Sequence, residues 1–357
     1  MIVNYKIHEV SEYINWIYFF HAWGFQPKFA AIADIHGCDS CRAMWLTGFA
    51  EEDRPKASEA MQLFKEANRM LNELDTAYQT HGVVNIMDAN ADGDDLLLNS
   101  KRFPLLRQQT AKLKEDDPFL CLSDFVRPLS SGITDKVGAF ATTVDAEMER
   151  RYAEDDYKRM LVQTLSDRLA EATAEKLHED VRKKLWGYAP DENLSVKDLH
   201  NEKYQGIRPA VGYPSLPDQS VNFLLDELLD MKQIGISLTE NGMMKPHASV
   251  CGLMFAHPAS RYFSIGKIGE DQLADYAARR GMSIEETKKV SRRQSIKKRI
   301  NYDADKVISV FSTATDIARY VYIQGIYTPC FPKMDTLGLL ASQSVSFIGN
   351  DISLFYT

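Results

Sequence analysis

The amino-acid sequence predicts an α+β fold around an antiparallel sheet, and three observations lead to this prediction. Helical and β-rich segments are mixed along the chain and do not alternate as βαβ units would. Neighbouring β-rich segments are separated by turn residues, which is typical of antiparallel pairs. Neither a GxGxxG nor a GxxxxGK(S/T) motif occurs, so the sequence does not support a Rossmann or P-loop site.

Residues 58–78 are predicted to form an amphipathic helix, which is followed by strands. Apolar residues recur at helical spacing along one side of this helix: Met61, Phe64, Ala67, Leu71 and Leu74. The β-rich runs 82–87 and 95–98 flank the acidic stretch DANADGD, which predicts a strand pair with a long turn. Residues 138–143 are a further strand candidate.

The longest helix is predicted over residues 145–186, where Glu, Lys, Arg, Ala and Leu dominate. Its apolar stripe recurs at multiples of four: Leu161, Leu165, Leu169, Leu177, Val181 and Leu185. The helix leads toward a proline-rich loop at 207–218, and residues 220–234 form the next predicted helix.

The remaining elements are two strands and two helices. Residues 248–256 and 262–268 are predicted as an antiparallel pair joined by HPASR. A helix then runs from Asp271 to a glycine stop at Gly281, and Ser283 with Glu286 forms a capping box for the helix that follows.

Composition restricts the classes of protein to which the chain can belong. Its 357 residues are 45% apolar and 26% charged, which is typical of a soluble globular protein of one or two domains. The formal charge of −8 argues against a general nucleic-acid binder. No apolar run is long enough to span a membrane, no signal peptide is recognisable, and the five cysteines form no even disulfide framework. We expect a cytoplasmic protein with no membrane partner.

The loop IRPAVGYPSLPD, residues 207–218, holds an arginine among three prolines and a glycine, so it is rigid and irregular. A rigid arginine can bind a carboxylate, an acidic oxygen can accept from an ammonium group, and aromatic faces can cover a flat heterocycle. Residues with these abilities are Arg208, Glu171, Tyr213, Tyr262 and Phe263. Sequence separation leaves other roles open: Arg208 could tie loop carbonyls together, Glu171 could be solvated, and Tyr262 and Phe263 could face opposite sides of a strand.

The stretch DANADGDDLLLN places acidic residues as an EF-hand loop would, but Asn99 stands where a bidentate glutamate is needed. An acidic hairpin turn is therefore the preferred interpretation. The motif HGCDSC brings three soft ligands into six residues, namely His36, Cys38 and Cys41. A closed zinc site needs a fourth ligand and no second CxxC exists, so a metal site or redox pair is left open and no metal is predicted.

Two further features receive a structural interpretation. The basic run KKVSRRQSIKKR, residues 288–299, lacks interleaved aromatic residues and is expected to be a solvated helix face, although an acidic protein partner would also fit. His257 lies in FAHP between two predicted strands and is expected to be a buried, hydrogen-bonded histidine at a turn.

Long motifs give the chain a family resemblance. LSDRLAEATAEKLHEDVRKKLWGYAPDENLS, YQGIRPAVGYPSLPD, ASVCGLMFAHPASRY and DQLADYAARRGM resemble the activation domain of cobalamin-dependent methionine synthase. Shorter matches include YINWIYFFHAW, LRQQT and CLSDFV, so that the resemblance spans residues 5–303. It implies a C-shaped single α+β domain around a twisted antiparallel sheet with flanking helices. The domain is expected over residues 1–305, followed by a C-terminal extension of unknown role at 306–357.

The resemblance also implies a function. Such a domain binds S-adenosylmethionine and supplies its methyl group for reductive methylation, or reactivation, of cob(II)alamin. The cobalamin is carried by a partner domain or chain, and a flavodoxin-type or other flavoprotein supplies the electron. DIHGCD begins like the Asp-x-His-x-x-Gly signature of cobalamin-binding domains, but Asp39 stands at the required glycine. We therefore expect this chain to carry no corrinoid itself.

Site residues follow from the matched motifs. Arg208 would bind the carboxylate of S-adenosylmethionine, and Glu171 would be a polar contact near its amine. The loop wall and the contacts to the adenosyl part would come from Ala210, Gly212, Tyr213, Tyr262 and Phe263. No general base is required, since the sulfonium is already an activated methyl carrier.

The sequence departs from the family pattern at three positions. Asn15 stands where the family usually has an aspartate that contacts the cofactor, so the charge that an ammonium or sulfonium would prefer is absent. Val211 and Gln219 replace the usual proline and histidine. Residues 36–56 also fall outside the matched pattern.

No homocysteine, folate or cobalamin module is recognisable in the sequence. We therefore expect the chain to be an excised domain or to act in trans, as the reactivation component of a methionine synthase. The alternative is a non-catalytic module that docks on a corrinoid protein. Such a module would tolerate loss of Arg208 or Glu171, and both residues are present.

Overall fold

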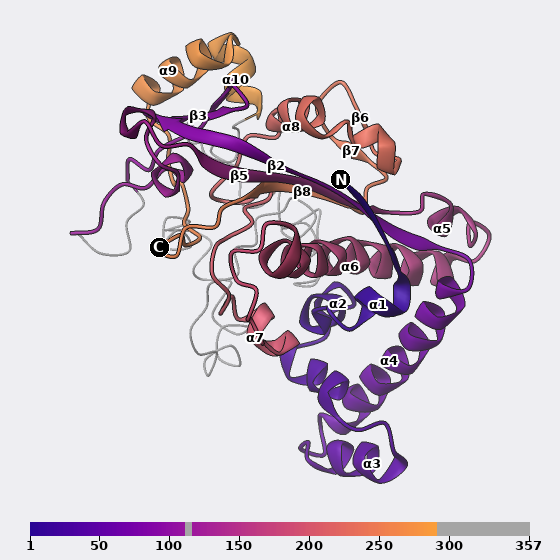
Figure 1. Cartoon of the computed structure of the whole chain (residues 1–357). Helices are drawn as coiled ribbons and strands as arrows, with labels where there is room; N and C mark the ends of the chain where they lie inside the picture. Colours follow the sequence, from indigo (N-terminus) through magenta and orange to yellow (C-terminus); the bar gives the residue numbers. More distant parts are fainter. Residues whose placement is uncertain (111–115, 291–357) are drawn as a thin grey trace, which may run out of the picture. The chain divides into compact units, whose positions relative to one another are not determined.

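The computed structural model describes residues 1–110 and 116–290 (Figure 1). All of these residues belong to one compact unit, which ends at Ser295. The second unit, Ile296–Thr357, lies wholly outside the described residues. The expected extension at 306–357 and most of the basic run at 288–299 therefore lie outside them as well.

The elements have the following bounds. The strands are β1 (Ile2–Lys6), β2 (Gln79–Asp92), β3 (Asp95–Leu98), β4 (Lys101–Pro104), β5 (Asp135–Val144), β6 (Ser237–Leu238), β7 (Met244–Lys245) and β8 (Ser249–Met254). The helices are α1 (Ile7–Ser11), α2 (Trp16–Ala22), α3 (Asp39–Thr47), α4 (Arg54–Asp75), α5 (Glu147–Arg150), α6 (Asp156–Asp180), α7 (Val196–His200), α8 (Val221–Leu229), α9 (Glu270–Arg280) and α10 (Ile284–Val290).

The main sheet is antiparallel throughout the described residues. Its strand order is β4-β3-β2-β5-β8, and β1 pairs with the start of β2. The long strand β2 pairs with β5 from Thr80 to Ala89, so these two strands form the centre of the sheet. The predicted α+β class with an antiparallel sheet and flanking helices is thus confirmed.

Side chains on the central strands alternate between two buried faces. On β2, Val83 packs in the cluster that includes α8, whereas Val84 packs in a cluster with Leu177 of α6. On β5, Ala139 and Phe140 divide in the same way. Figure 1 shows the result: α8 covers one face of the sheet and α6 the other. A sheet covered on both faces explains why nearly all of β5 is apolar or small.

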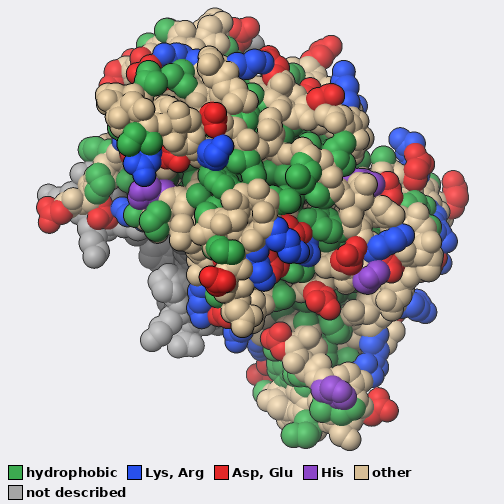
Figure 2. Space-filling view, in the orientation of Figure 1, with side chains coloured by type: hydrophobic (Ala, Val, Ile, Leu, Met, Phe, Trp, Pro, Cys, Tyr) green, Lys and Arg blue, Asp and Glu red, His purple; other side chains and the backbone are tan. Residues whose placement is uncertain are grey.

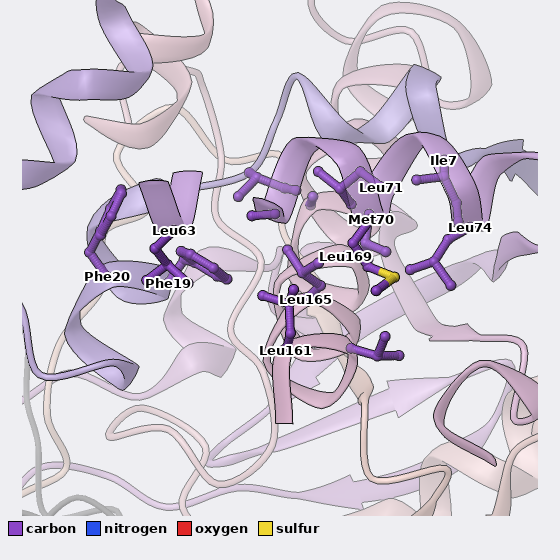
Figure 3. Packing of buried hydrophobic residues seen from close by; sticks show 14 of the residues in the cluster. Ile7, Phe19, Phe20, Leu63, Met70, Leu71, Leu74, Leu161, Leu165 and Leu169 are labelled. Carbon is purple, nitrogen blue, oxygen red and sulfur yellow. The ribbon is translucent and has the colours of Figure 1, made fainter. Parts of the chain in front are cut away.

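A second core lies between helices α1, α2, α4 and α6. Figure 3 shows its labelled residues pointing toward one another from these elements: Ile7, Phe19, Phe20, Leu63, Met70, Leu71, Leu74, Leu161, Leu165 and Leu169. Both predicted long helices are therefore confirmed. The apolar side of α4 faces the first part of the α6 stripe, from Leu161 to Leu169. Leu177 and the following Val181 pack instead against Val84 and Phe140 of the sheet. This packing fixes α6 between the helical core and the sheet.

The predicted long turn after residue 87 is wrong. Strand β2 continues through the acidic stretch to Asp92, and Gly93 and Asp94 alone connect it to β3. Ala89 and Ala91 are buried and alternate with the polar residues Asp88, Asn90 and Asp92, so the period of two persists through a stretch that looks polar overall. Gly93 has a φ of +62°, which a tight hairpin turn requires. The acidic-hairpin interpretation is confirmed: Asp92 pairs with Arg102 at 2.7 Å, and Asp94 pairs with Arg107 at 2.7 Å.

The longest helix begins later than its composition predicts. Residues 145–155 contain only the short helix α5, and α6 starts after Asp155, whose side chain accepts a hydrogen bond from the Lys158 N–H at 3.0 Å. The cap decides the start, because it satisfies a backbone donor that the helix leaves unpaired. At its other end the helix continues through a π-helical turn at Val181–Leu185.

The predicted strand at 262–268 is not formed. The edge of β8 is instead occupied by the proline-rich loop, whose Ile207 and Ala210 pair with Phe255 and Gly252. Val211 N–H donates to the Cys251 carbonyl at 2.9 Å. Since β5 already pairs with the other edge of β8, no position in the sheet remains for residues 262–268.

The predictions for the helices and for His257 after residue 219 are partly confirmed and partly corrected. Helix α9 ends at Gly281, which has a φ of +66°, and Ser283 and Glu286 form the expected capping box. The helix predicted at 220–234 is divided after Leu229 by Asp230, whose φ is +49°. His257 lies at a turn as predicted, but it is exposed. None of the described helices combines the length and apolarity that crossing a membrane would require.

Candidate functional site

The loop after α7 holds Arg208 at a fixed place beside α6. Its backbone N–H donates to the Tyr262 hydroxyl at 3.0 Å, and its guanidinium donates to Glu175 of α6 at 2.5 Å. The Arg208 side chain is 16% exposed and that of Glu175 8%. Arg208 therefore does not tie loop carbonyls together. It forms an almost buried ion pair across the space between the loop and the helix.

Glu171 lies one helical turn before Glu175 and faces the same loop. The Tyr213 hydroxyl donates to the Glu171 carboxylate at 3.0 Å. The pKa of Tyr213 is raised, first by the negative charge of Glu171 and then by burial. Arg208, Glu171 and Tyr213, which the sequence predicted as site residues, are thus brought together at one place.

Tyr262 and Phe263 diverge although they are adjacent. The Tyr262 hydroxyl accepts from the Arg208 backbone and lies 3.4 Å from the Tyr204 hydroxyl, so this ring belongs to the Arg208 cluster. Phe263 packs edge-to-face on Phe125, with ring centroids 6.3 Å apart. Both side chains are half-buried, so the strand-like division into a core residue and an outward residue is wrong. The structure brings Tyr262 to Arg208 and packs half-buried Phe263 against the cluster that includes Phe125 and Phe255.

Ala210 and Gly212 shape the loop through their backbones. Ala210 pairs with Gly252 of β8. Gly212 has a φ of +88°, and its N–H donates to the Leu216 carbonyl at 2.8 Å. A residue with a side chain rarely adopts this φ, so the glycine allows the loop to turn back and to present Tyr213 to Glu171.

Asn15 is the N-cap of α2. Its side-chain oxygen accepts from the Ile17 N–H at 3.2 Å. Helix α2 packs on α6, where the Arg168 guanidinium lies 5.9 Å from the centroid of the Tyr18 ring. Asn15 thus begins a helix that reaches α6 within one turn of Glu171. Its local role in the structure is to cap that helix.

Sequence reasoning missed a second layer of polar residues on α6. Arg182 is fully buried, binds Glu192 through several hydrogen bonds of 2.7–3.0 Å, and lies 4.4 Å from the Tyr204 ring centroid. Fully buried His178 contacts Tyr204 edge-to-face. Burial, aided by Arg182 and Arg208, holds the pKa of His178 well below its ordinary value. A signal was present in the sequence, since Glu171, Glu175, His178 and Arg182 follow an i, i+4, i+7, i+11 pattern away from the leucine stripe.

The donor set of this cluster suits a zwitterionic ligand. Glu175 Oε1 and Arg208 Nε are buried and have no hydrogen-bond partner within residues 1–110 and 116–290. Buried polar atoms without partners are costly, and ligand binding is one way to satisfy them. An α-amino acid group carries one carboxylate and one ammonium, which the guanidinium and the carboxylates of the cluster complement in charge. S-adenosylmethionine carries such a group and therefore fits the residues present.

Comparisons with known proteins show the family to which the chain belongs. The family model described as "Vitamin B12 dependent methionine synthase, activation domain" matches residues 6–281, which is more than half of the chain. A solved structure, described as the crystal structure of the MetH reactivation domain bound to AdoHcy, is 38% identical to the chain, with a TM-score of 0.73. The match covers 85% of this chain and 90% of that one. The chain therefore belongs to the family of vitamin B12-dependent methionine synthase activation domains.

Proposed function

We propose that the chain binds S-adenosylmethionine at the Arg208–Glu171 cluster and supplies its methyl group for the reductive methylation of cob(II)alamin in a methionine synthase. The observation that carries the proposal is the meeting of Arg208, Glu171, Tyr213 and Tyr262 across the loop and α6. The solved relative bound to AdoHcy, the demethylated form of this ligand, supports the same ligand class.

The residues of the cluster would bind and orient the ligand. The Arg208 guanidinium would bind its carboxylate, and Glu171 would accept from its ammonium group. Ala210, Gly212 and Tyr213 would form the wall of the site, Tyr262 would hold Arg208 in place, and Phe263 would support the loop from the core. Asn15 would approach from the start of α2.

The chemistry asks little of the protein beyond orientation. When bound, S-adenosylmethionine supplies a methyl group that its positively charged sulfur already activates. The rigid loop on β8 lowers the ordering cost of binding, because Arg208 is held before the ligand arrives. No side chain of the cluster needs to remove a proton.

The proposed reaction needs two partners. Cobalamin would be carried by the cobalamin-binding module of a methionine synthase, with which this chain acts in trans or as an excised domain. A flavodoxin-type or other flavoprotein would supply the one electron that cob(II)alamin needs before it accepts the methyl group. The proposed domain covers residues 1–305, with 306–357 as a separate extension, and a cytoplasmic location stays a prediction.

Calorimetric titration with S-adenosylmethionine, and with S-adenosylhomocysteine alongside, tests the proposal. We expect saturable binding by the wild type and no detectable binding by Arg208→Ala, because the change removes the charge that holds the carboxylate. The matched control is Arg150→Ala on α5, which removes an exposed arginine that pairs with neighbouring Glu147. Circular dichroism would show that each variant is folded.

The same titration separates the proposed function from its alternative. Binding that survives in Arg208→Ala would refute the assignment of the site. A folded wild type that binds neither ligand, but still binds a cobalamin-loaded partner, would favour a non-catalytic docking module. Methyl transfer to a reduced corrinoid partner, lost in Arg208→Ala, would establish the activity itself.

A further inference from the structure

A separate cluster of soft ligands lies at the start of α3, outside the Arg208 site. His36, Cys38 and Cys41 each place a ligand atom so that all three atoms lie within 4.8 Å of one another. The cluster belongs to residues 36–56, which lie outside the motifs that carry the family resemblance but within the span 6–281 that the family model matches. Figure 1 shows α3 at the end of the helical layer that is far from the sheet, and Figure 2 shows histidine at the surface of that end.

The backbone places the two thiols on one side. Cys38 is the N-cap of α3, and its sulfur accepts from the Cys41 N–H at 3.2 Å. The Cys38 thiol also donates to the Cys41 sulfur, with the two sulfurs 2.8 Å apart. Both cysteines are free and half-buried, whereas His36 is exposed, so an ion from solvent can reach all three.

From this geometry we propose that His36, Cys38 and Cys41 bind one soft divalent metal ion, with Zn²⁺ as the best match. Two thiolates and one imidazole are ligands that zinc prefers, and three protein ligands with an open fourth position are a recognised zinc arrangement. The sequence argument against a metal rested on the missing fourth ligand. A site whose fourth position is filled by water or by a partner does not need a fourth ligand from this chain.

Metal binding requires a small rearrangement and no redox step. The two sulfurs would move apart to about 3.8 Å, the edge of a tetrahedron with zinc–sulfur bonds of about 2.3 Å. Each thiol loses its proton to solvent as its metal–sulfur bond forms, and neutral His36 contributes a nitrogen lone pair. A disulfide pair would use the cysteines alone. The imidazole within the same small sphere favours a metal.

The proposed ion would join the loop before α3 to the first turn of the helix. Helix α3 has no buried residue of its own. It packs on the helical core through Trp45, Leu46 and the following Phe49, whose ring stacks on Phe29 with centroids 5.3 Å apart. A segment with so little core is of the kind that a structural metal commonly stabilises.

Cobalt titration of the full-length, chemically reduced chain under anaerobic conditions tests the proposal. We expect one Co²⁺ per chain, with a thiolate-to-cobalt charge-transfer absorption that stoichiometric Zn²⁺ removes. Cys38→Ser and Cys41→Ser should abolish this absorption. His36→Gln should weaken Co²⁺ binding by more than about a hundredfold, beyond the usual effect of changing an outer ligand partner.

His257→Gln is the matched control, because it removes another exposed histidine and should leave the absorption unchanged. Absence of the absorption in reduced, folded wild type would overturn the proposal, and so would its survival in both cysteine variants. Treatment with a small-molecule disulfide gives the remaining outcome. If the small-molecule disulfide oxidises Cys38 and Cys41 to a disulfide, so that the chain loses two hydrogens, and the reduced chain binds no metal, then the cluster is a redox pair and not a metal site.

Discussion

The buried pair of Arg208 and Glu175 is the residue-scale feature that most affects ligand binding. The pKa of Arg208 is raised: burial alone would lower it, but Glu175 and the other acidic groups around the guanidinium, Tyr204, Tyr262 and Glu171, together outweigh burial. A ligand carboxylate must therefore bind an arginine that already has an anionic partner. Glu175 keeps the guanidinium in place before binding, yet it also repels the incoming carboxylate.

Glu175→Gln should separate these two effects. We expect the ligand-free variant to be less stable by about 3 kcal/mol, because a buried guanidinium loses its counter-charge. We also expect S-adenosylmethionine to stabilise this variant more than it stabilises the wild type, since repulsion of the carboxylate is removed. Thermal unfolding with and without ligand measures both quantities. Equal ligand-induced shifts in the two proteins would show that Glu175 does not oppose the ligand.

Asn15→Asp tests whether the start of α2 belongs to the site. Aspartate caps a helix as well as asparagine and adds charge that a helix N-terminus favours, so the fold should keep its stability or gain about 0.5 kcal/mol. If Asn15 faces the ligand, binding of S-adenosylmethionine should become tighter in calorimetry. An unchanged or weaker binding constant would mean that Asn15 only caps the helix here.

At the scale of elements, the proline-rich loop behaves as an additional edge of the sheet. Leu253 N–H donates to the Pro209 carbonyl at 3.1 Å, and Ile207 exchanges hydrogen bonds with Phe255. The close approach needs a glycine on β8: a Cβ at Gly252 would lie 2.2 Å from the Pro209 carbonyl oxygen. The strand thereby fixes the backbone on either side of Arg208.

Gly252→Ala should therefore disrupt the site without touching a proposed ligand contact. The added methyl group forces the loop away from β8, at a cost of about 1–3 kcal/mol for overpacking. Affinity for S-adenosylmethionine should fall at least about tenfold, since 1.4 kcal/mol of lost preorganisation corresponds to that factor. Denaturant unfolding and calorimetry measure the two effects.

Gly37→Ala is the control for this substitution. Its added Cβ would lie 3.6 Å from the Arg42 side chain, which is an ordinary contact. It should leave ligand affinity unchanged. A Gly252→Ala protein with wild-type affinity would show that the loop does not need its place on β8 to form the site.

At the scale of the whole molecule, buried His178 links stability to pH. Its pKa is held well below the ordinary value by burial, so the folded chain keeps this imidazole neutral where the unfolded chain protonates it. A depressed pKa gives stability that is present above the unfolded value, about 6.5, and is lost as pH falls toward the folded value. His178 thus favours unfolding in acid.

We predict that the free energy of unfolding falls below about pH 6.5, with a contribution from His178 of up to about 1.4 kcal/mol per pH unit. His178→Gln should make the decline shallower, and the exposed-residue control His257→Gln should not. Urea unfolding at several pH values measures the slopes. NMR titration of wild-type His178 gives an independent check, since protonation near pH 6.5 in the folded chain would contradict the prediction.

Much of this fold followed from local pattern. The amphipathic stripe of α4, the leucine repeat of α6, the small apolar residues of β5 and the caps around Gly281 and Ser283 depend on neighbours in sequence, and each was predicted. Predictions failed where distant segments compete. Residues 262–268 have a strand-like composition, but the loop occupies the edge of β8 that they would need.

For the candidate site, too, some features could be predicted from the sequence and others could not. The sequence by itself determined its chemistry: a charged arginine in a stiff loop, an acidic residue on a separate helix face, and motifs that identified the family. Only the tertiary structure decided which groups meet. It paired Arg208 with Glu175, packed Phe263 on Phe125, and buried His178 beside Arg182. The physical reason is that side-chain identity fixes charge and hydrogen-bonding capacity, whereas partner choice and burial depend on packing between residues far apart in the chain.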